Sequence, residues 1–140
     1  MSAPVVPSST PTRLSRSIPL LASLDIERTL EFYAERLGFV REVFHVDDAA
    51  GVERDGVQIH FWKCDDRRIA ENTSCRIEVI GIDGLFTELL PQGVVHPNGP
   101  LEDKPWGYRE FAVLDCDGNL ITFVEELAVT GSPSPIEATP

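Results

Sequence analysis

Asp55-Gly56-Val57-Gln58-Ile59-His60-Phe61 is repeated, with changes, as Asp117-Gly118-Asn119-Leu120-Ile121-Thr122-Phe123. The two stretches are identical at four of seven positions. Each opens with Asp-Gly, a pair that favours a tight turn, and then alternates its side chains as a strand does. The first strand is predicted to turn Val57, Ile59 and Phe61 to a helix-covered face. Gln58, His60 and Trp62 then point to the opposite face.

The first half of the chain, up to and including the first copy, predicts a strand, a helix and three more strands. A buried strand is expected over 18–24, and Asp25 is a suitable N-cap for a helix that Gly38 ends. Strands are then predicted over 40–46, 51–54 and 57–64, separated by turns at Asp47-Asp48 and Asp55-Gly56. The helix is amphipathic, and its predicted buried stripe consists of Ile26, Leu30, Tyr33 and Leu37.

The second half of the chain follows the same order. A strand is predicted over 75–81, a helix capped by Asp83 and ended by Gly93 follows, and strands are expected over 94–96, 109–114 and 120–125. The apolar stripe of this helix consists of Leu85, Phe86, Leu89 and Leu90. The repeated order favours a duplicated βαβββ unit, which is an α+β fold.

The ends of the chain differ in composition from its centre. Residues 1–16 and 130–140 are rich in Pro, Ser and Thr and lack apolar periodicity, so we expect a disordered arm and a disordered tail. The folded domain is predicted over 17–129, with modules at about 17–66 and 73–129. The charged run from Asp65 to Arg68 is interpreted as a solvated turn between them.

Charge and cysteine content limit the partners and the compartment. Twelve Lys and Arg against 23 Asp and Glu give a formal net charge of -11, which disfavours nucleic acid and anionic membrane surfaces as partners. The start of the chain lacks a signal-peptide core, and a soluble cytoplasmic protein is expected. Cys64, Cys75 and Cys116 form no CxxC pair and are interpreted as reduced thiols.

Three stretches resemble one known superfamily. They are LDIERTLEFYAERLGF at 24–39, DGVQIHFW at 55–62 and WGYREFAVLDCDGNLITF at 106–123. They are similar to the glyoxalase, bleomycin-resistance and dioxygenase superfamily over about 17–127. Within it, the layout is most similar to the bleomycin-resistance branch. The resemblance implies an α+β fold of two paired βαβββ modules whose curved mixed sheets enclose a cleft.

The resemblance also implies where metal ligands belong. Metal-dependent members use His, Gln or Glu at four strand positions, and three of these fall on Ile18, about Ile77 and Thr122, which cannot hold a metal. His60 is the only ligand-capable match. His45 and His96 could in principle join it, but strand pairing gives no reason for the three to converge. No metal and no cofactor are therefore expected.

A cleft without a metal indicates binding rather than catalysis. The leading hypothesis is a homodimer that sequesters a cationic or aromatic small molecule, such as a bleomycin-type antibiotic, without altering it. The alternatives are a divergent metal-dependent glyoxalase or dioxygenase, and a purely structural or interaction role. The predicted ligand-binding residues are Phe44, His60, Trp62, Trp106, Gly107, Tyr108, Arg109 and Thr122. Packing of Trp62 and Trp106 in the protein remains the alternative for those two.

Overall fold

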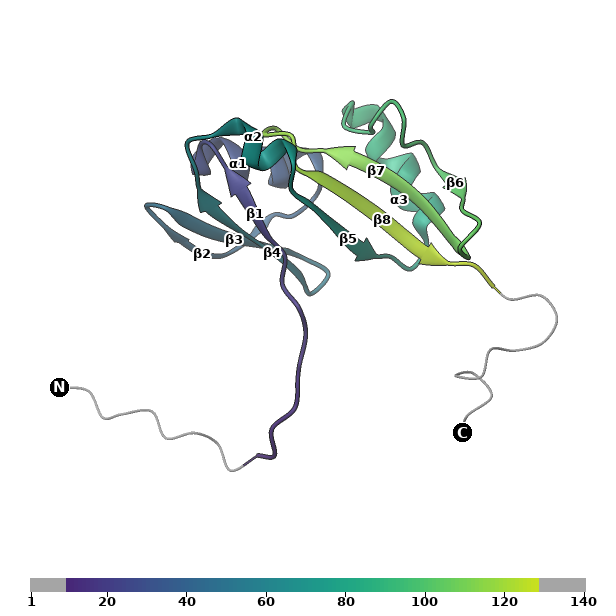
Figure 1. Ribbon diagram of the computed structural model, residues 1–140, viewed down its shortest axis with the longest axis horizontal. Coiled ribbons are helices and arrows are strands. Elements are labelled where there is room, and N and C mark those ends of the chain that lie inside the picture. The colour runs from purple at the N-terminus through teal and green to yellow at the C-terminus, as the bar shows by residue number, and fades with distance from the viewer. Residues whose placement is uncertain (1–9, 129–140) are drawn as a thin grey trace.

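Two four-stranded mixed sheets form the protein in the computed structural model, which describes residues 10–128 (Figure 1). The first sheet has the order β1-β4-β3-β2 and the second the order β5-β8-β7-β6. Its strands are β1 (Leu20–Ser23), β2 (Arg41–Val46), β3 (Ala49–Arg54) and β4 (Val57–Lys63). Those of the second sheet are β5 (Ser74–Glu78), β6 (Glu102–Asp103), β7 (Tyr108–Leu114) and β8 (Leu120–Glu126).

The strand registers confirm the duplicated βαβββ unit. β1 pairs in parallel with β4, setting Leu20 beside His60, and β5 pairs in parallel with β8, setting Arg76 beside Thr122. His60 and Thr122 therefore occupy equivalent places in the two sheets. The sheets are not joined into a closed structure, so the cleft expected from the resemblance is not enclosed by one chain.

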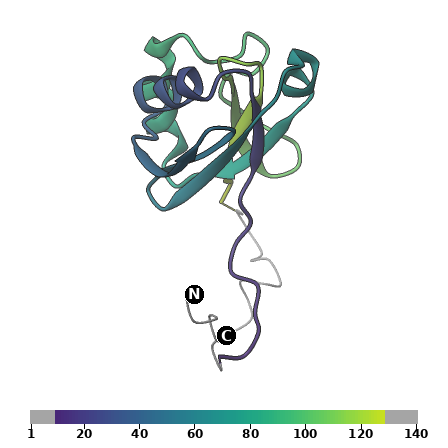
Figure 2. The same ribbon diagram turned by 90° about the vertical axis from the view of Figure 1, so that its left-hand side faces the viewer.

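Two helices cover one side of the sheets. Figure 2 shows α1 (Ile26–Arg36) and α3 (Ile82–Leu89) on the same side, whereas α2 (Arg67–Glu71) lies on the other. α1 begins as predicted, with the Asp25 carboxylate accepting a hydrogen bond from the Arg28 amide at 3.1 Å. Its stripe is buried, and Gly38 follows with φ of 78°, a conformation that glycine adopts without strain.

The predicted cap of α3 is wrong. The helix begins at Ile82, so Asp83 lies inside its first turn, and the capping position is Gly81, which has no side chain. Glu125 on β8 supplies the carboxylate instead, accepting from the amides of Gly81 at 3.0 Å and Ile82 at 2.9 Å. These hydrogen bonds lower the pKa of Glu125. Glu125, which is distant in sequence but close in space, thus caps the helix in place of Asp83.

Three smaller predictions are also corrected. Residues 94–96 form no strand, because only Val95 makes a single bridge, to Val113. The run from Asp65 to Arg68 is not a simple turn: Asp66 caps α2 by accepting from the Arg68 amide at 3.0 Å. Leu90 leaves the predicted stripe, because it begins the 3-10 helix η1 (Leu90–Gln92) and is exposed.

One hydrophobic core runs through both modules. It includes Tyr33 and Phe61 from the first and Phe111 and Phe123 from the second. Residues 10–16 are exposed and belong to no helix or strand, while the rest of the predicted arm, 1–9, and the tail, 130–140, lie outside the described residues. Within residues 10–128, no helix is long and apolar enough to cross a membrane.

A buried polar joint fastens α1 to the turn between β7 and β8. The Tyr33 hydroxyl donates to Asp115 at 2.6 Å, and the Asn119 side-chain amide donates to Asp115 at 2.7 Å and to the Ala22 carbonyl at 2.8 Å. Thr29 donates to Asp117 at 3.0 Å, and Arg28 also pairs with that carboxylate. Burial raises the pKa of Asp115, although the hydrogen bonds from Tyr33 and Asn119 oppose the rise.

Candidate ligand-binding surface

Aromatic side chains lie on the open face of the first sheet, opposite α1. As predicted, Ile59 and Phe61 are buried in the core, whereas His60 and Trp62 point the other way. The Phe44 ring meets the His60 ring edge-on, with 4.9 Å between centroids. Gly51 lies beneath them, and a Cβ there would be 2.7 Å from the Phe44 ring and 2.9 Å from that of His60. The glycine therefore allows the two rings to rest on β3.

A second group lies on the open face of the other sheet. Trp106, in the loop before β7, is 59% exposed and donates from Nε1 to Glu110 at 2.7 Å. Arg76 donates to the same carboxylate at 2.6 Å, and its guanidinium lies 6.0 Å from the centre of the Tyr108 ring. Because Arg76 is level with Thr122, it reaches diagonally past this short side chain on β8 to Glu110 on β7.

Glu110 and Arg76 were missed in the sequence. Glu110 is only 4% exposed. Strand alternation could have found Glu110, because it shares a face of β7 with Tyr108. Arg76 could be placed only from the register of β5 against β8, which sets it beside Thr122.

Arg109 is predicted as a ligand-binding residue but lies on the other face of β7. It alternates with Phe111 into the side covered by α3, where it pairs with Asp83 at 3.0 Å and Asp103 at 2.6 Å. These two carboxylates raise the pKa of Arg109. The side chain is therefore not brought together with Trp106 and Tyr108.

Gly107 and Thr122 complete the second group in different ways. Gly107 has φ of 92° and donates its amide to the Lys104 carbonyl at 3.1 Å, which closes the turn that carries Trp106. Thr122 is half-buried between Arg76 and Ala112. Within residues 10–128, no hydrogen bond or ring contact links this group to Phe44, His60 and Trp62.

The residues present do not fit the metal site of the metal-dependent members. Ile77 lies in the core, on the face opposite Thr122, and the residue level with Thr122 is Arg76, one position earlier. The fixed positive charge of a guanidinium disfavours a divalent cation at that place. Among the described residues, no group of three or more His, Cys, Asp or Glu side chains could hold a metal ion.

The three histidines do not converge. His45 is turned to the α1 side of its sheet, where its ring nitrogens lie 2.9 Å from Glu27 and 3.1 Å from Glu42. His60 lies on the opposite face. The Nδ1 atom of His96 accepts a hydrogen bond from the Asn98 amide at 2.9 Å, within its own loop.

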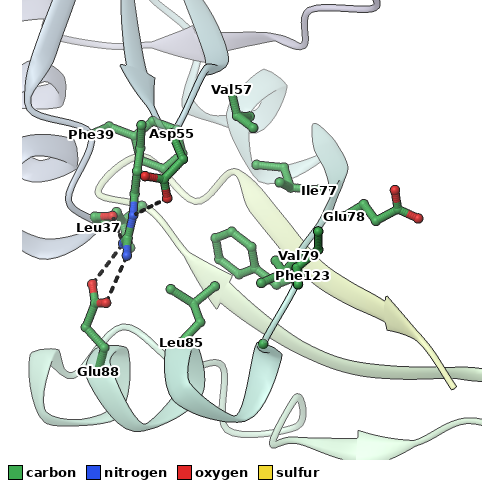
Figure 3. A pocket seen from close by; sticks show the side chains of 13 residues that line it. Leu37, Phe39, Asp55, Val57, Ile77, Glu78, Val79, Leu85, Glu88 and Phe123 are labelled. Atoms are coloured by element: carbon green, nitrogen blue, oxygen red, sulfur yellow. Dashed lines mark hydrogen bonds and ion pairs between the residues drawn. The ribbon is translucent and has the colours of Figure 1, made fainter. Parts of the chain in front are cut away.

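A separate pocket of about 420 Å³ lies between the modules on the helix-covered side (Figure 3). Arg54, from the hairpin of β3 and β4, donates to both carboxylate oxygens of Glu88 on α3, at 2.8 and 2.9 Å, and to the Leu37 carbonyl at 2.8 Å. None of the eight predicted ligand-binding residues lines this pocket. The ion pair between Arg54 and Glu88 joins the two modules at this pocket. The exposed aromatic residues of the open faces lie outside it.

Comparison with known proteins gives consistent matches. A family model described as "Glyoxalase superfamily protein" matches residues 8–130. The bleomycin resistance proteins of Geobacillus stearothermophilus and Staphylococcus aureus are each 39% identical over 129 aligned residues, covering 80% of this chain and 97% of the relative. These matches confirm the resemblance found in the sequence motifs.

Solved structures agree with these matches. The bleomycin-binding protein of Streptomyces verticillus, crystallised with copper(II)-bleomycin, is 30% identical, with a TM-score of 0.72 over 84% of this chain and 99% of that chain. A bleomycin resistance determinant encoded on the transposon Tn5 is 24% identical, with a TM-score of 0.70 over 81% of this chain and 98% of that one. This second likeness supports the fold.

Proposed function

This chain belongs to the glyoxalase superfamily and, within it, to the bleomycin resistance proteins, and on that premise we propose that it binds and sequesters bleomycin-type antibiotics without altering them. The observation that carries the proposal is the 39% identity to bleomycin resistance proteins over nearly their whole length. A relative that is 30% identical to this chain was crystallised with copper(II)-bleomycin bound.

The open faces suit such a ligand. Trp62 and Trp106 present exposed indoles, and aromatic faces stack on flat heteroaromatic rings and attract cations. A net charge of -11 draws a cationic antibiotic toward the protein over several ångströms. The ligand-binding residues in this proposal are Phe44, His60, Trp62, Trp106, Gly107, Tyr108 and Thr122; Arg109 is left out because it faces α3.

A homodimer completes the cleft in this proposal. The two sheets of one chain do not close, and the open face of the first sheet exposes apolar side chains, including Leu20, Phe44, Val46 and Trp62. An exposed apolar face of this kind marks an interaction site. We assign a second copy of the chain to it, so that aromatic residues of one subunit face those of the other across the ligand.

The alternative of a metal-dependent enzyme lacks the side chains that would bind its metal. The positions implied for metal ligands hold Ile18, Ile77 and Thr122, and the register places Arg76 beside Thr122. No step that requires a metal can be assigned to these side chains. In this proposal the protein therefore lowers the concentration of free antibiotic by binding alone.

Calorimetric titration with metal-free bleomycin and with copper(II)-bleomycin tests the function. We expect saturable heat with both forms, a dimer in gel filtration, and antibiotic of unchanged mass after release from the protein. Absence of heat at tens of micromolar protein would contradict the proposed ligand. Recovery of a chemically modified antibiotic would contradict the non-catalytic function.

A further inference from the structure

We infer that Glu110 is a positioning residue that holds the Trp106 indole over the open face of the second sheet. The inference rests on the proposed function, because it assigns Trp106 to ligand binding. Glu110 is not among the residues expected to touch the ligand. It acts through the indole.

The carboxylate of Glu110 is well placed for this task. It is 4% exposed, and its Oε2 atom accepts from Trp106 Nε1 at 2.7 Å and from Arg76 at 2.6 Å. A second Arg76 nitrogen lies 3.4 Å from Oε1. Charge-assisted hydrogen bonds of this length are stronger than neutral ones. The Glu110 carboxylate is therefore held in place and can fix the orientation of the exposed Trp106 side chain.

Apolar packing alone does not fix the indole. Trp106 is 59% exposed and stands in a loop, with the Lys104 ammonium 5.9 Å from its ring centre. A side chain that is free to rotate loses conformational entropy when a ligand stacks on it. The bond to Glu110 orders the ring before the ligand arrives, which reduces that loss.

The charges around Glu110 keep it ionised. Arg76 on β5 is the main cause that lowers the pKa of Glu110, and Trp106 and Lys104 act in the same direction, although burial opposes them. Glu102 on β6 lies opposite Glu110 in the pairing of β6 with β7. The Lys104 ammonium forms an ion pair with Glu102. Tyr108 is the neighbouring side chain on the same face of β7. Since Arg76 neutralises Glu110, this carboxylate is an anchor for the indole rather than a partner for a cationic ligand.

A double-mutant cycle with bleomycin tests the coupling. Glu110→Ala is expected to weaken binding by up to about tenfold, the cost of ordering one side chain. In the Trp106→Ala background the same change should have little further effect, because Glu110 acts only through the indole. Glu126→Ala, which removes an exposed carboxylate from the same face, is the matched control and should bind like the wild type. Full additivity of the two changes would overturn the inference.

A second measurement needs no ligand and so separates this inference from the proposed function. The chain has two tryptophans, so Trp62→Phe leaves Trp106 as the single indole. Because the folded-state pKa of Glu110 is lowered, the anchor is present above its ordinary value of 4.5 and is lost as the pH falls below it. Trp106 fluorescence should therefore stay constant from pH 8 to 5 and change with a midpoint below 4.5.

Glu110→Gln in the Trp62→Phe background should abolish that step and increase quenching of Trp106 by acrylamide. A step that persists in Glu110→Gln, or one with a midpoint above 4.5, would overturn the positioning role. If bleomycin fails to bind but the fluorescence step behaves as described, the positioning role stands and the proposed ligand is wrong.

Discussion

Asp115→Ala is expected to lower the free energy of unfolding by about 3 kcal/mol, as removing the shared acceptor of a buried network does. Asp115 accepts four hydrogen bonds: from the Tyr33 hydroxyl, from the amides of Asp117 and Asn119, and from the Asn119 side chain. After the change, the fully buried Tyr33 hydroxyl and two backbone amides lose their partner. Domains of this size are stable by only about 5–15 kcal/mol, so the loss is large.

Urea unfolding at a fixed protein concentration measures this effect. Tyr33→Phe is the matched variant, because it removes one donor and leaves Asp115 with three, so a loss of about 1 kcal/mol is expected. The joint connects α1 to the β7–β8 turn, and the m-value shows whether the modules still unfold together. A loss below 1 kcal/mol for Asp115→Ala would show that the joint contributes little to pairing of the modules.

Trp106→Ala is expected to weaken bleomycin binding about 30-fold or more while leaving the free energy of unfolding within about 0.5 kcal/mol of the wild type. The reason is that the indole is more than half exposed, donates a hydrogen bond to Glu110 and lies near the Lys104 ammonium. Truncating such a side chain opens no core cavity but removes a large stacking surface from the ligand.

Titration calorimetry and thermal unfolding of the same preparation measure both effects. Leu90→Ala is the control, because Leu90 is about equally exposed but lies at the end of α3, away from the open faces. It should change neither binding nor stability appreciably. If Trp106→Ala instead lowered the melting temperature by several degrees and left binding intact, Trp106 would be a packing residue.

The local features of the fold were predictable because they depend on residues near each other in the chain. The Asp25 cap, the buried stripe of α1, the turn at Asp55-Gly56 and the alternating faces of β4 follow from capping, helical spacing and strand alternation. The same reasoning predicted the wrong cap for α3, because the carboxylate of Glu125 comes from β8.

The candidate site was predicted less completely for a related reason. Exposed aromatic residues such as Phe44 and Trp62 could be identified from alternation and composition, but the contact between Arg76 and Glu110 beside Trp106 could not. Arg76 and Glu110 belong to β5 and β7, which are separated by β8 in the sheet. Their contact depends on two strand registers, which alternation within one strand does not specify.

The sequence by itself therefore determined the repeated module and its side-chain faces, since both depend on local spacing and side-chain chemistry. The tertiary structure alone decided that Arg109 pairs with Asp83 on α3, that Arg76 stands level with Thr122, and that Glu110 accepts a hydrogen bond from Trp106. It also decided the joint between Tyr33 and Asp115. The physical reason is that these contacts join segments far apart in the chain, and only strand register and module packing bring them within hydrogen-bonding distance.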